Sequence, residues 1–149
     1  MIVTFLGHAD FLRTEEYEGQ ILSFLEETVG DLPAEMYLGG YDGFDRFAFE
    51  CCKKYKAAHP YISLVSILPY LPVDDRYNCR DKGYDLSVYP EIENRPKKYA
   101  IVYRNRYMVE KADFVIAYVT HGWGGAYAAY KYAKRRGKRV FNLADWEES

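Results

Sequence analysis

Residues 114–126 constrain the fold more than any other stretch of the chain. Residues 114–119 are six apolar residues in a row, rich in β-branched and aromatic types, and they predict a buried strand of a parallel sheet. Three glycines follow within residues 122–125, and residues 127–136 then predict a helix. A strand, a glycine-rich turn and a helix N-terminus form an anion site, because glycine admits a ligand close to the backbone and the first helical N–H groups point at it.

The spacing of these glycines does not identify the anion. It is neither the dinucleotide fingerprint G-x-G-x-x-G nor a Walker A loop, because no Gly-Lys-Ser/Thr follows. The stretch therefore indicates a phosphate-bearing ligand of unspecified kind. A tight turn that uses glycine only for its backbone conformation explains it equally well.

Strands and helices alternate along the whole chain. The alternation predicts an α/β fold with a mostly parallel five-stranded sheet, and residues 1–149 have the length of a single domain. Residues 73–96 show no sustained period and predict a lid or binding segment, or a short strand at Leu86–Tyr89. The other expected strands are 2–6, 35–38, 61–68 and 140–143, the other expected helices are 12–29, 44–57 and 97–111, and Leu12, Ile21, Leu22 and Leu25 are the expected core positions of the first helix.

Composition limits the partners and the compartment. A net charge of −2 and a pI near 5.9 argue against nucleic acid and anionic membranes as partners. No apolar run has the length of a membrane span, and no basic segment precedes the first strand, so we expect no signal peptide and a cytoplasmic protein. Sixteen tyrosines suit half-buried surfaces, a base-stacking pocket or a subunit interface, and we expect a homo-oligomer.

Cysteine and histidine usage predicts no bound metal and no cofactor. The three cysteines form no disulfide framework, and Cys51 and Cys52 lie in an expected helix with no base partner, which predicts a packing role. The three histidines are far apart in sequence and lack zinc spacing.

Three of the five expected strands end in glycine-rich turns. In a parallel sheet such turns meet at the carboxyl edge, where ligands bind, and this convergence favours a nucleotide-like ligand. His8 and His121 follow two of the strands and could polarise a phosphate or simply hydrogen-bond the turns. Asp42 and Asp45 begin a helix, where capping is the safer interpretation for Asp45 and binding of a ribose hydroxyl is the alternative.

Arginines and lysines are weighed by their position on helices. Arg104 and Arg106 point about 200° apart on one helix, so only one faces the site, and we favour Arg106. The six basic residues within 131–139 are explained as cations that complement a helix C-terminus. The predicted ligand-binding residues are Gly7, His8, Gly39, Gly40, Asp42, Arg104, Arg106, Thr120, His121, Gly122, Trp123, Gly124 and Gly125.

Five segments of the chain together carry a family resemblance. They are Thr4-Phe-Leu-Gly-His8, Gly39-Gly-Tyr-Asp-Gly-Phe-Asp45, Arg104-Asn-Arg-Tyr-Met108 with Ala112-Asp-Phe-Val-Ile116, Gly122-Trp-Gly-Gly-Ala126, and Lys138-Arg-Val-Phe-Asn-Leu143. They resemble the SLOG superfamily, the Rossmann-like group that contains Lonely-Guy-type phosphoribohydrolases and the core domain of the DNA-processing protein DprA. The resemblance covers nearly the whole chain and implies a three-layer Rossmann-like fold with a nucleotide or nucleotide-derivative site at the glycine-rich loops.

The chain departs from the enzymatic branch of this superfamily at the catalytic acid. That branch carries Pro-Gly-Gly-x-Gly-Thr followed by glutamate, whereas Tyr127 and Ala128 occupy the glutamate positions here. The resemblance thus implies a nucleotide sensor or binding protein without turnover. The alternative is an enzyme that cleaves or transfers at an N-glycosidic bond, a phosphoribohydrolase or deoxyribosyltransferase, with its carboxylate from elsewhere. A purely structural or partner-binding protein, suggested by the tyrosine excess, ranks last. The candidate carboxylates are Asp10, Asp42, Asp45 and Glu50.

Overall fold

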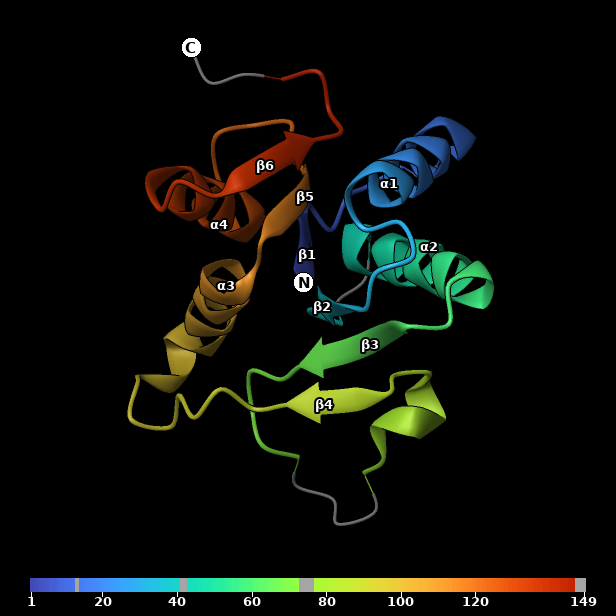
Figure 1. The fold of residues 1–149 in the computed structure, drawn as a ribbon. Coiled ribbons are helices and arrows are strands. Elements are labelled where there is room, and N and C mark those ends of the chain that lie inside the picture. The colour runs from blue at the N-terminus through green and yellow to red at the C-terminus, as the bar shows by residue number, and fades with distance from the viewer. Residues whose placement is uncertain (13, 41–42, 73–76, 147–149) are drawn as a thin grey trace.

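Six parallel strands form one sheet in a computed structural model that describes residues 1–12, 14–40, 43–72 and 77–146. The strand order is β4-β3-β2-β1-β5-β6, and every neighbouring pair is parallel (Figure 1). The strands are β1 (Ile2–Gly7), β2 (Ala34–Leu38), β3 (Ile62–Ile67), β4 (Leu86–Val88), β5 (Phe114–Tyr118) and β6 (Arg139–Asn142).

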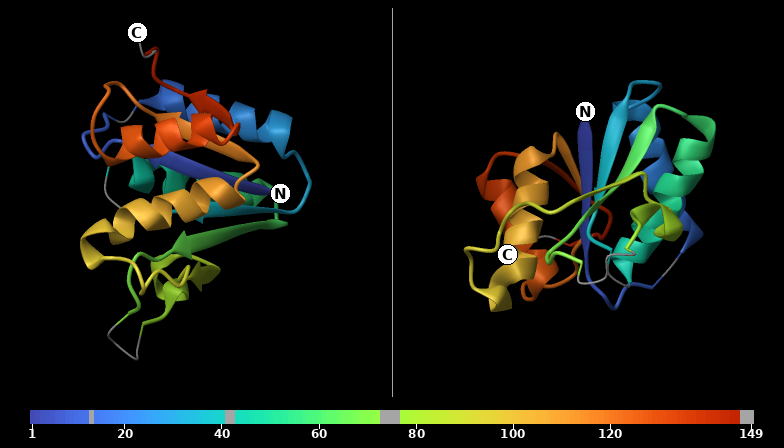
Figure 2. Two further views of the ribbon diagram at one scale, coloured as in Figure 1. Left: turned by 90° about the vertical axis from the view of Figure 1, so that its left-hand side faces the viewer. Right: turned by 90° about the horizontal axis from the view of Figure 1, so that it is seen from below.

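Two pairs of helices cover the two faces of this sheet, which makes three layers (Figure 2). One face carries α1 (Glu15–Thr28) and α2 (Phe44–Ala58), and the other carries α3 (Ala100–Lys111) and α4 (Gly125–Arg135). Two short 3₁₀ helices, η1 (Cys79–Lys82) and η2 (Lys97–Tyr99), lie in the long connection around β4. The predicted α/β fold of Rossmann-like type is confirmed. No helix among the described residues has the length and apolar character needed to cross a membrane.

The sheet has six strands where the sequence predicted five, because β4 pairs with β3 through an interaction distant in sequence. The carboxylate of Asp85, just before β4, accepts hydrogen bonds from the backbone N–H of Leu64 at 2.8 Å and from Lys56 Nζ at 2.6 Å. These contacts hold a three-residue strand that shows no periodicity of its own.

The apolar faces of the helices form a core on each side of the sheet. Ile21 and Leu25 are fully buried as predicted, and Cys51 and Cys52 are buried packing residues of α2. Leu12 was wrongly predicted to be in the core and is 79% exposed. Helix α1 begins only at Glu15, where the Thr14 hydroxyl accepts a hydrogen bond from the Tyr17 N–H, and Leu12 therefore precedes the helix.

The sheet changes its direction of growth between β1 and β5. From β1 the chain adds β2, β3 and β4 on one side, and then β5 and β6 on the other, with the helices of the two halves on opposite faces. Such a point opens a crevice at the carboxyl ends of the two strands, and ligands of open α/β sheets bind there.

Arg104 of α3 fastens the carboxyl ends of β2 and β3. It is 1% exposed, and its Nη1 donates to the carbonyl oxygens of Gly39 at 2.7 Å and Ile67 at 3.1 Å. Its Nε donates to Asn105 Oδ1 at 2.9 Å. A guanidinium has five N–H donors, so one side chain can bond to both carbonyl oxygens and to Asn105.

We expect the substitution Arg104→Met to lower the free energy of unfolding by about 3 kcal/mol, because it removes the guanidinium that donates to the buried carbonyl of Ile67 and the part-buried carbonyl of Gly39. Urea denaturation measures this loss. Arg106→Met is the matched control on the same helix, since Arg106 is exposed and should cost less than about 1 kcal/mol. Equal stability of the two variants would contradict a structural role for Arg104.

Candidate functional site

A cavity of about 490 Å³ lies at the carboxyl ends of β1 and β5. Its walls come from the end of β1 and the loop after it, from α3, and from the loop between β5 and α4. This size is within the range of small-molecule sites, roughly 300–1,000 Å³. The described residues that give it chemical character are His8, Asp10, Asp45, Arg104, Asn105, His121 and Trp123.

Three aromatic rings form a column in this cavity. His8 and His121 stack with ring centroids 3.8 Å apart and planes 14° from parallel, and Trp123 stacks on His121 at 3.9 Å. The inner end is fixed, because His8 is buried and its Nε2 accepts a hydrogen bond from the Thr120 N–H at 3.1 Å. The outer end is free to contact a ligand, because Trp123 is 69% exposed. The column therefore presents a flat, supported ring at the mouth of the cavity.

The environment of His8 favours the neutral imidazole. Burial lowers its pKa, the nearby His121 lowers it further, and the carboxylate of Asp10 opposes both. The neutral ring agrees with the acceptor role of Nε2 toward Thr120. His8 is thus a buried support for the column and carries no charge at neutral pH.

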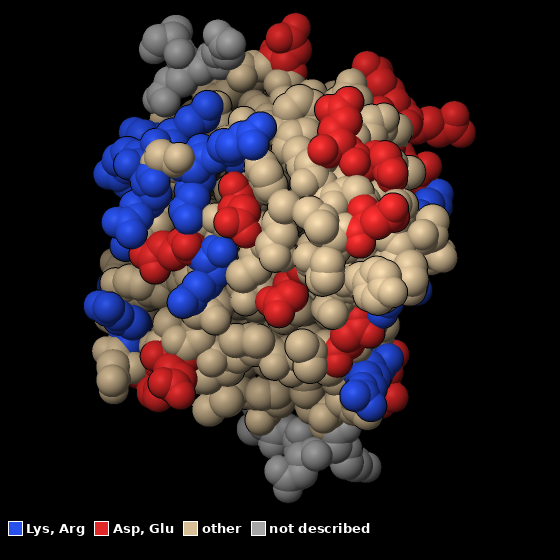
Figure 3. All heavy atoms as spheres, viewed as in Figure 1, with Lys and Arg blue, Asp and Glu red and all other residues tan. Residues whose placement is uncertain are grey.

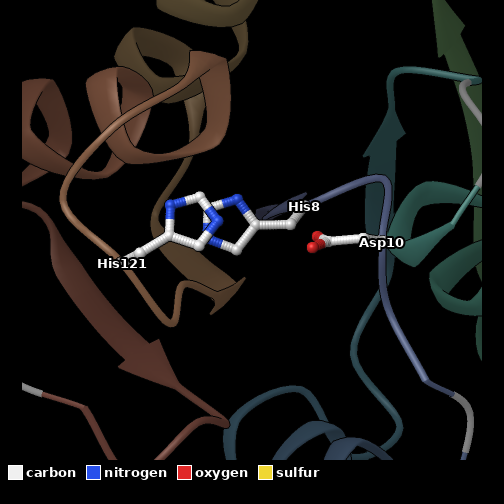
Figure 4. A group of neighbouring side chains, drawn as sticks. All are labelled: His8, Asp10 and His121. Atoms are coloured by element: carbon white, nitrogen blue, oxygen red, sulfur yellow. The ribbon is translucent and has the colours of Figure 1, made fainter.

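His8, Asp10 and His121 place potential metal-ligating atoms within 4.8 Å of one another (Figure 4). A metal ion needs lone pairs that converge on one point about 2.0–2.2 Å away. The two imidazoles lie almost parallel, so their in-plane lone pairs run side by side, and one nitrogen of His8 is already an acceptor. The observed geometry favours ring stacking over metal binding.

The glycines of the loop before α4 leave the N-terminus of that helix without a side-chain cap. Gly124 is the N-cap, with φ 92° and ψ 174°, a backbone conformation that only glycine adopts without strain. It offers no side chain to accept from the first N–H groups of the helix, and the first turn of α4 contains no acidic residue. The N-terminus of α4, which borders the cavity, therefore suits a phosphate oxygen.

A smaller basic groove of about 210 Å³ continues from this cavity between α3 and α4. Asn105 and Gly125 border both hollows, and the groove adds Arg106, Lys131 and Arg135. Arg106 lies over the rings of Tyr103 and Tyr132, with centroid distances of 5.7 Å and 5.2 Å.

Charge is unevenly distributed over the surface. Figure 3 shows Lys and Arg side chains gathered where Figure 1 places α4 and β6, and Asp and Glu gathered around α1. The net charge of −2 averages these two regions. It was therefore a poor guide to what the basic face can bind.

The structure distributes the predicted site residues over three hollows. Arg104, and not the favoured Arg106, lines the central cavity, while Arg106 lines the groove. Gly39 and Gly40 line a third hollow, and Thr120 touches the column through its N–H. Asp42 lies outside the described residues. The predicted residues in the wall of the central cavity are Gly7, His8, Arg104, His121, Trp123, Gly124 and Gly125; Gly122 lies beside Tyr127 and Trp146.

Sequence reasoning missed Asn105, Lys131 and Arg135. The two cations were assigned to the helix C-terminus, although Lys131 lies in the middle of α4. Their spacing of four residues was the available signal, since it places both side chains on one face of a helix. The expected homo-oligomer and the expected cytoplasmic location stay predictions.

Comparison with known proteins supports the fold. No family model matches the sequence, and no curated protein matches it. Among solved structures, the chain is similar to DNA processing protein A from Helicobacter pylori, with a TM-score of 0.63 and 19% sequence identity. The match covers 100% of this chain and 67% of that one. At this identity the likeness shows the fold alone, which is Rossmann-like.

That structure is described as showing a unique single-stranded DNA binding mode. The finding corrects two expectations from the sequence, a nucleotide sensor without turnover and the exclusion of nucleic acid as a partner. A protein of the same fold is thus described as binding single-stranded DNA. The alternative of an enzyme acting at an N-glycosidic bond is withdrawn with them.

We expect the neutral state of His8 to make folding pH-dependent. Because burial lowers the pKa of His8 in the folded state, its contribution is fully present above the unfolded pKa, about 6.5, and is lost as pH falls through the folded value. His8→Gln keeps an acceptor for Thr120 and removes the titration. Unfolding free energies of both proteins between about pH 7.5 and about pH 5.5 test this. The wild type should lose more stability over that range, and equal losses would contradict the prediction.

Proposed function

We propose that the protein binds single-stranded nucleic acid at the carboxyl edge of its sheet, as a SLOG-type domain. An unpaired base stacks on the exposed face of Trp123, and the phosphates next to it follow the N-terminus of α4 and the basic groove. The observation that carries the proposal is the continuity of the aromatic column with that groove through Asn105 and Gly125.

The column supplies affinity that does not depend on sequence. Every base has a flat π-face, and stacking on an aromatic side chain contributes about 1–3 kcal/mol per base. Trp123 is held by His121 at 3.9 Å, so its ring is supported before a ligand arrives. A base inside a duplex is already stacked on both faces, and the column therefore selects unpaired bases.

The basic groove supplies the electrostatic part of the affinity for a nucleic-acid strand. Arg106, Lys131 and Arg135 line the groove that leads away from the cavity, and Arg106 also contacts the rings of Tyr103 and Tyr132. A free nucleotide would fill the cavity and leave this groove without a ligand. A nucleic-acid strand with several phosphates occupies both the cavity and the groove. The similar solved structure, which is described as binding single-stranded DNA, supports a strand over a free nucleotide as the ligand.

Fluorescence anisotropy with a labelled oligothymidylate tests the proposal. We expect measurable affinity for the single strand, weaker binding to a duplex of the same length, and a loss of about 1–3 kcal/mol in the variant Trp123→Ala. Tyr61→Ala is the matched control, because Tyr61 is 67% exposed and precedes β3 at the opposite, amino-terminal edge of the sheet. An oligothymidylate affinity that Trp123→Ala leaves unchanged would remove the column from the site.

The salt dependence of binding tests the groove separately. Each phosphate contact on a single strand contributes about 0.7 to the slope of log affinity against log salt concentration. The double variant Lys131→Ala/Arg135→Ala should therefore reduce that slope by about 1.4. Lys54→Ala is the control, since Lys54 lies on α2 at the other face of the sheet and pairs with Glu18 at 2.6 Å. The same slope in all three proteins would exclude the groove as a phosphate path.

A further inference from the structure

A third hollow, of about 690 Å³, lies beside the central cavity at the carboxyl ends of β2 and β3. Asp45 borders both hollows. The third hollow, at β3 and β2, and the central cavity, at β1 and β5, form one row along the edge that binds ligands in parallel sheets. The basic groove leads from the central cavity between α3 and α4.

Gly39 and Gly40, next to the side chain of Arg104, leave space in the third hollow that a Cβ atom would reduce. A Cβ on Gly39 would lie 3.0 Å from Asp45 Oδ2 and 3.2 Å from the guanidinium carbon of Arg104. Gly40 has φ +81°, and a Cβ there would lie 3.8 Å from the Tyr84 hydroxyl. Gly39 and Gly40, both predicted to bind a ligand, therefore line the third hollow and not the central cavity that contains the aromatic column.

The walls combine aromatic rings with cations. Phe49 and Tyr84 are in contact, with ring centroids 4.7 Å apart, and Lys53 lies 5.6 Å from the Phe49 centroid. Lys82 lies 5.4 Å from the centroid of Tyr77. Burial, with the nearby Asp45 as the next cause, raises the pKa of Tyr84 to about 12, so its hydroxyl stays a hydrogen-bond donor at neutral pH.

The hollow is lined by three cations, Arg46, Lys53 and Lys82, and by two acids, Asp45 and Glu50. Arg46 lies 3.9 Å from Glu50 in a pair one helical turn apart. Lys53 comes from α2 and Lys82 from η1, so the cations of the hollow outnumber its acids and favour an anion. Rings for a base and cations for its phosphate are the two elements of single-strand recognition.

We propose that this hollow is a second nucleotide subsite. One base of a nucleic-acid strand stacks on Trp123, and this hollow binds a further nucleotide of the same strand. The inference rests on the proposed function. The two hollows are separated by about two strand spacings, on the order of 10 Å, which a short stretch of strand can cross. The base lies against the rings of Tyr70 and Tyr77, and Lys82 contacts its phosphate.

Affinity as a function of oligonucleotide length tests the subsite. Labelled oligothymidylates of about 4 to about 12 nucleotides are titrated against the wild type and against Tyr70→Ala/Lys82→Ala. Both side chains are exposed, so we expect the double variant to fold, and far-UV CD with a melting curve checks this. Tyr61→Ala/Lys54→Ala changes the same residue types away from the row of hollows and is the matched control.

We expect the wild type and the control to gain affinity with length, and the double variant to bind the shortest oligomer normally but to lose about 5-fold or more of that gain. If the double variant keeps the full gain, the subsite is wrong and the proposed function stands. If no oligomer binds the wild type at any length, the proposed function fails and the subsite fails with it. A double variant that did not fold would be replaced by Lys82→Ala alone, with the same expected direction.

Discussion

The parallel pairing of β1 with β5 brings the two halves of the candidate site together. The register runs from Val3 opposite Phe114 to Gly7 opposite Tyr118, and the His8 N–H extends it to the Tyr118 carbonyl at 3.3 Å. One residue later on each chain segment, the loops diverge because their helices cover opposite faces of the sheet. The imidazole of His8 and the N–H of Thr120 meet at that divergence, and the aromatic column is built outward from this contact.

Local sequence patterns predicted the elements that pack through regular faces. Buried strands and amphipathic helices bury most of their surface against the sheet, so periodicity was enough to find them. It left β4 as one of two alternatives, a short strand at Leu86–Tyr89 or a lid or binding segment, because this strand depends on Asp85 bonding to a residue 21 positions away. It also misplaced the start of α1, which Thr14 sets. Arg104 shows the same limit, because its burial depends on two carbonyls from distant strands that helical spacing cannot reveal.

The site was predicted more fully at its glycines and histidines than at its cations. Glycines that follow the strands identify the carboxyl edge of a parallel sheet without knowledge of the tertiary packing. Because His8 and His121 follow two strands at that edge, they lie close together. The role of Lys131 depends instead on which face of α4 turns toward α3, and this orientation is set by tertiary packing. Net charge failed for a related reason, since it sums over acidic α1 and the basic face of α4 and β6 (Figure 3). Binding depends on the local field, and charges beyond a Debye length of about 10 Å contribute little to it.

The acidic side chains of the central cavity limit where the phosphates of a bound nucleic-acid strand can lie. Asp10 and Asp45 both line the cavity, and a phosphate placed between them would be repelled. Arg104 also lines the cavity, where it donates to the carbonyl oxygens of Gly39 and Ile67. The other cations lie to either side, with Arg106, Lys131 and Arg135 in the groove between α3 and α4 and Lys53 and Lys82 around the third hollow. The favourable arrangement therefore puts a base and its sugar in the central cavity and the phosphates at its two flanks. Cations on both sides of the acidic cavity fit the proposed binding of a chain of nucleotides, whereas a single nucleotide would need only one of the flanks.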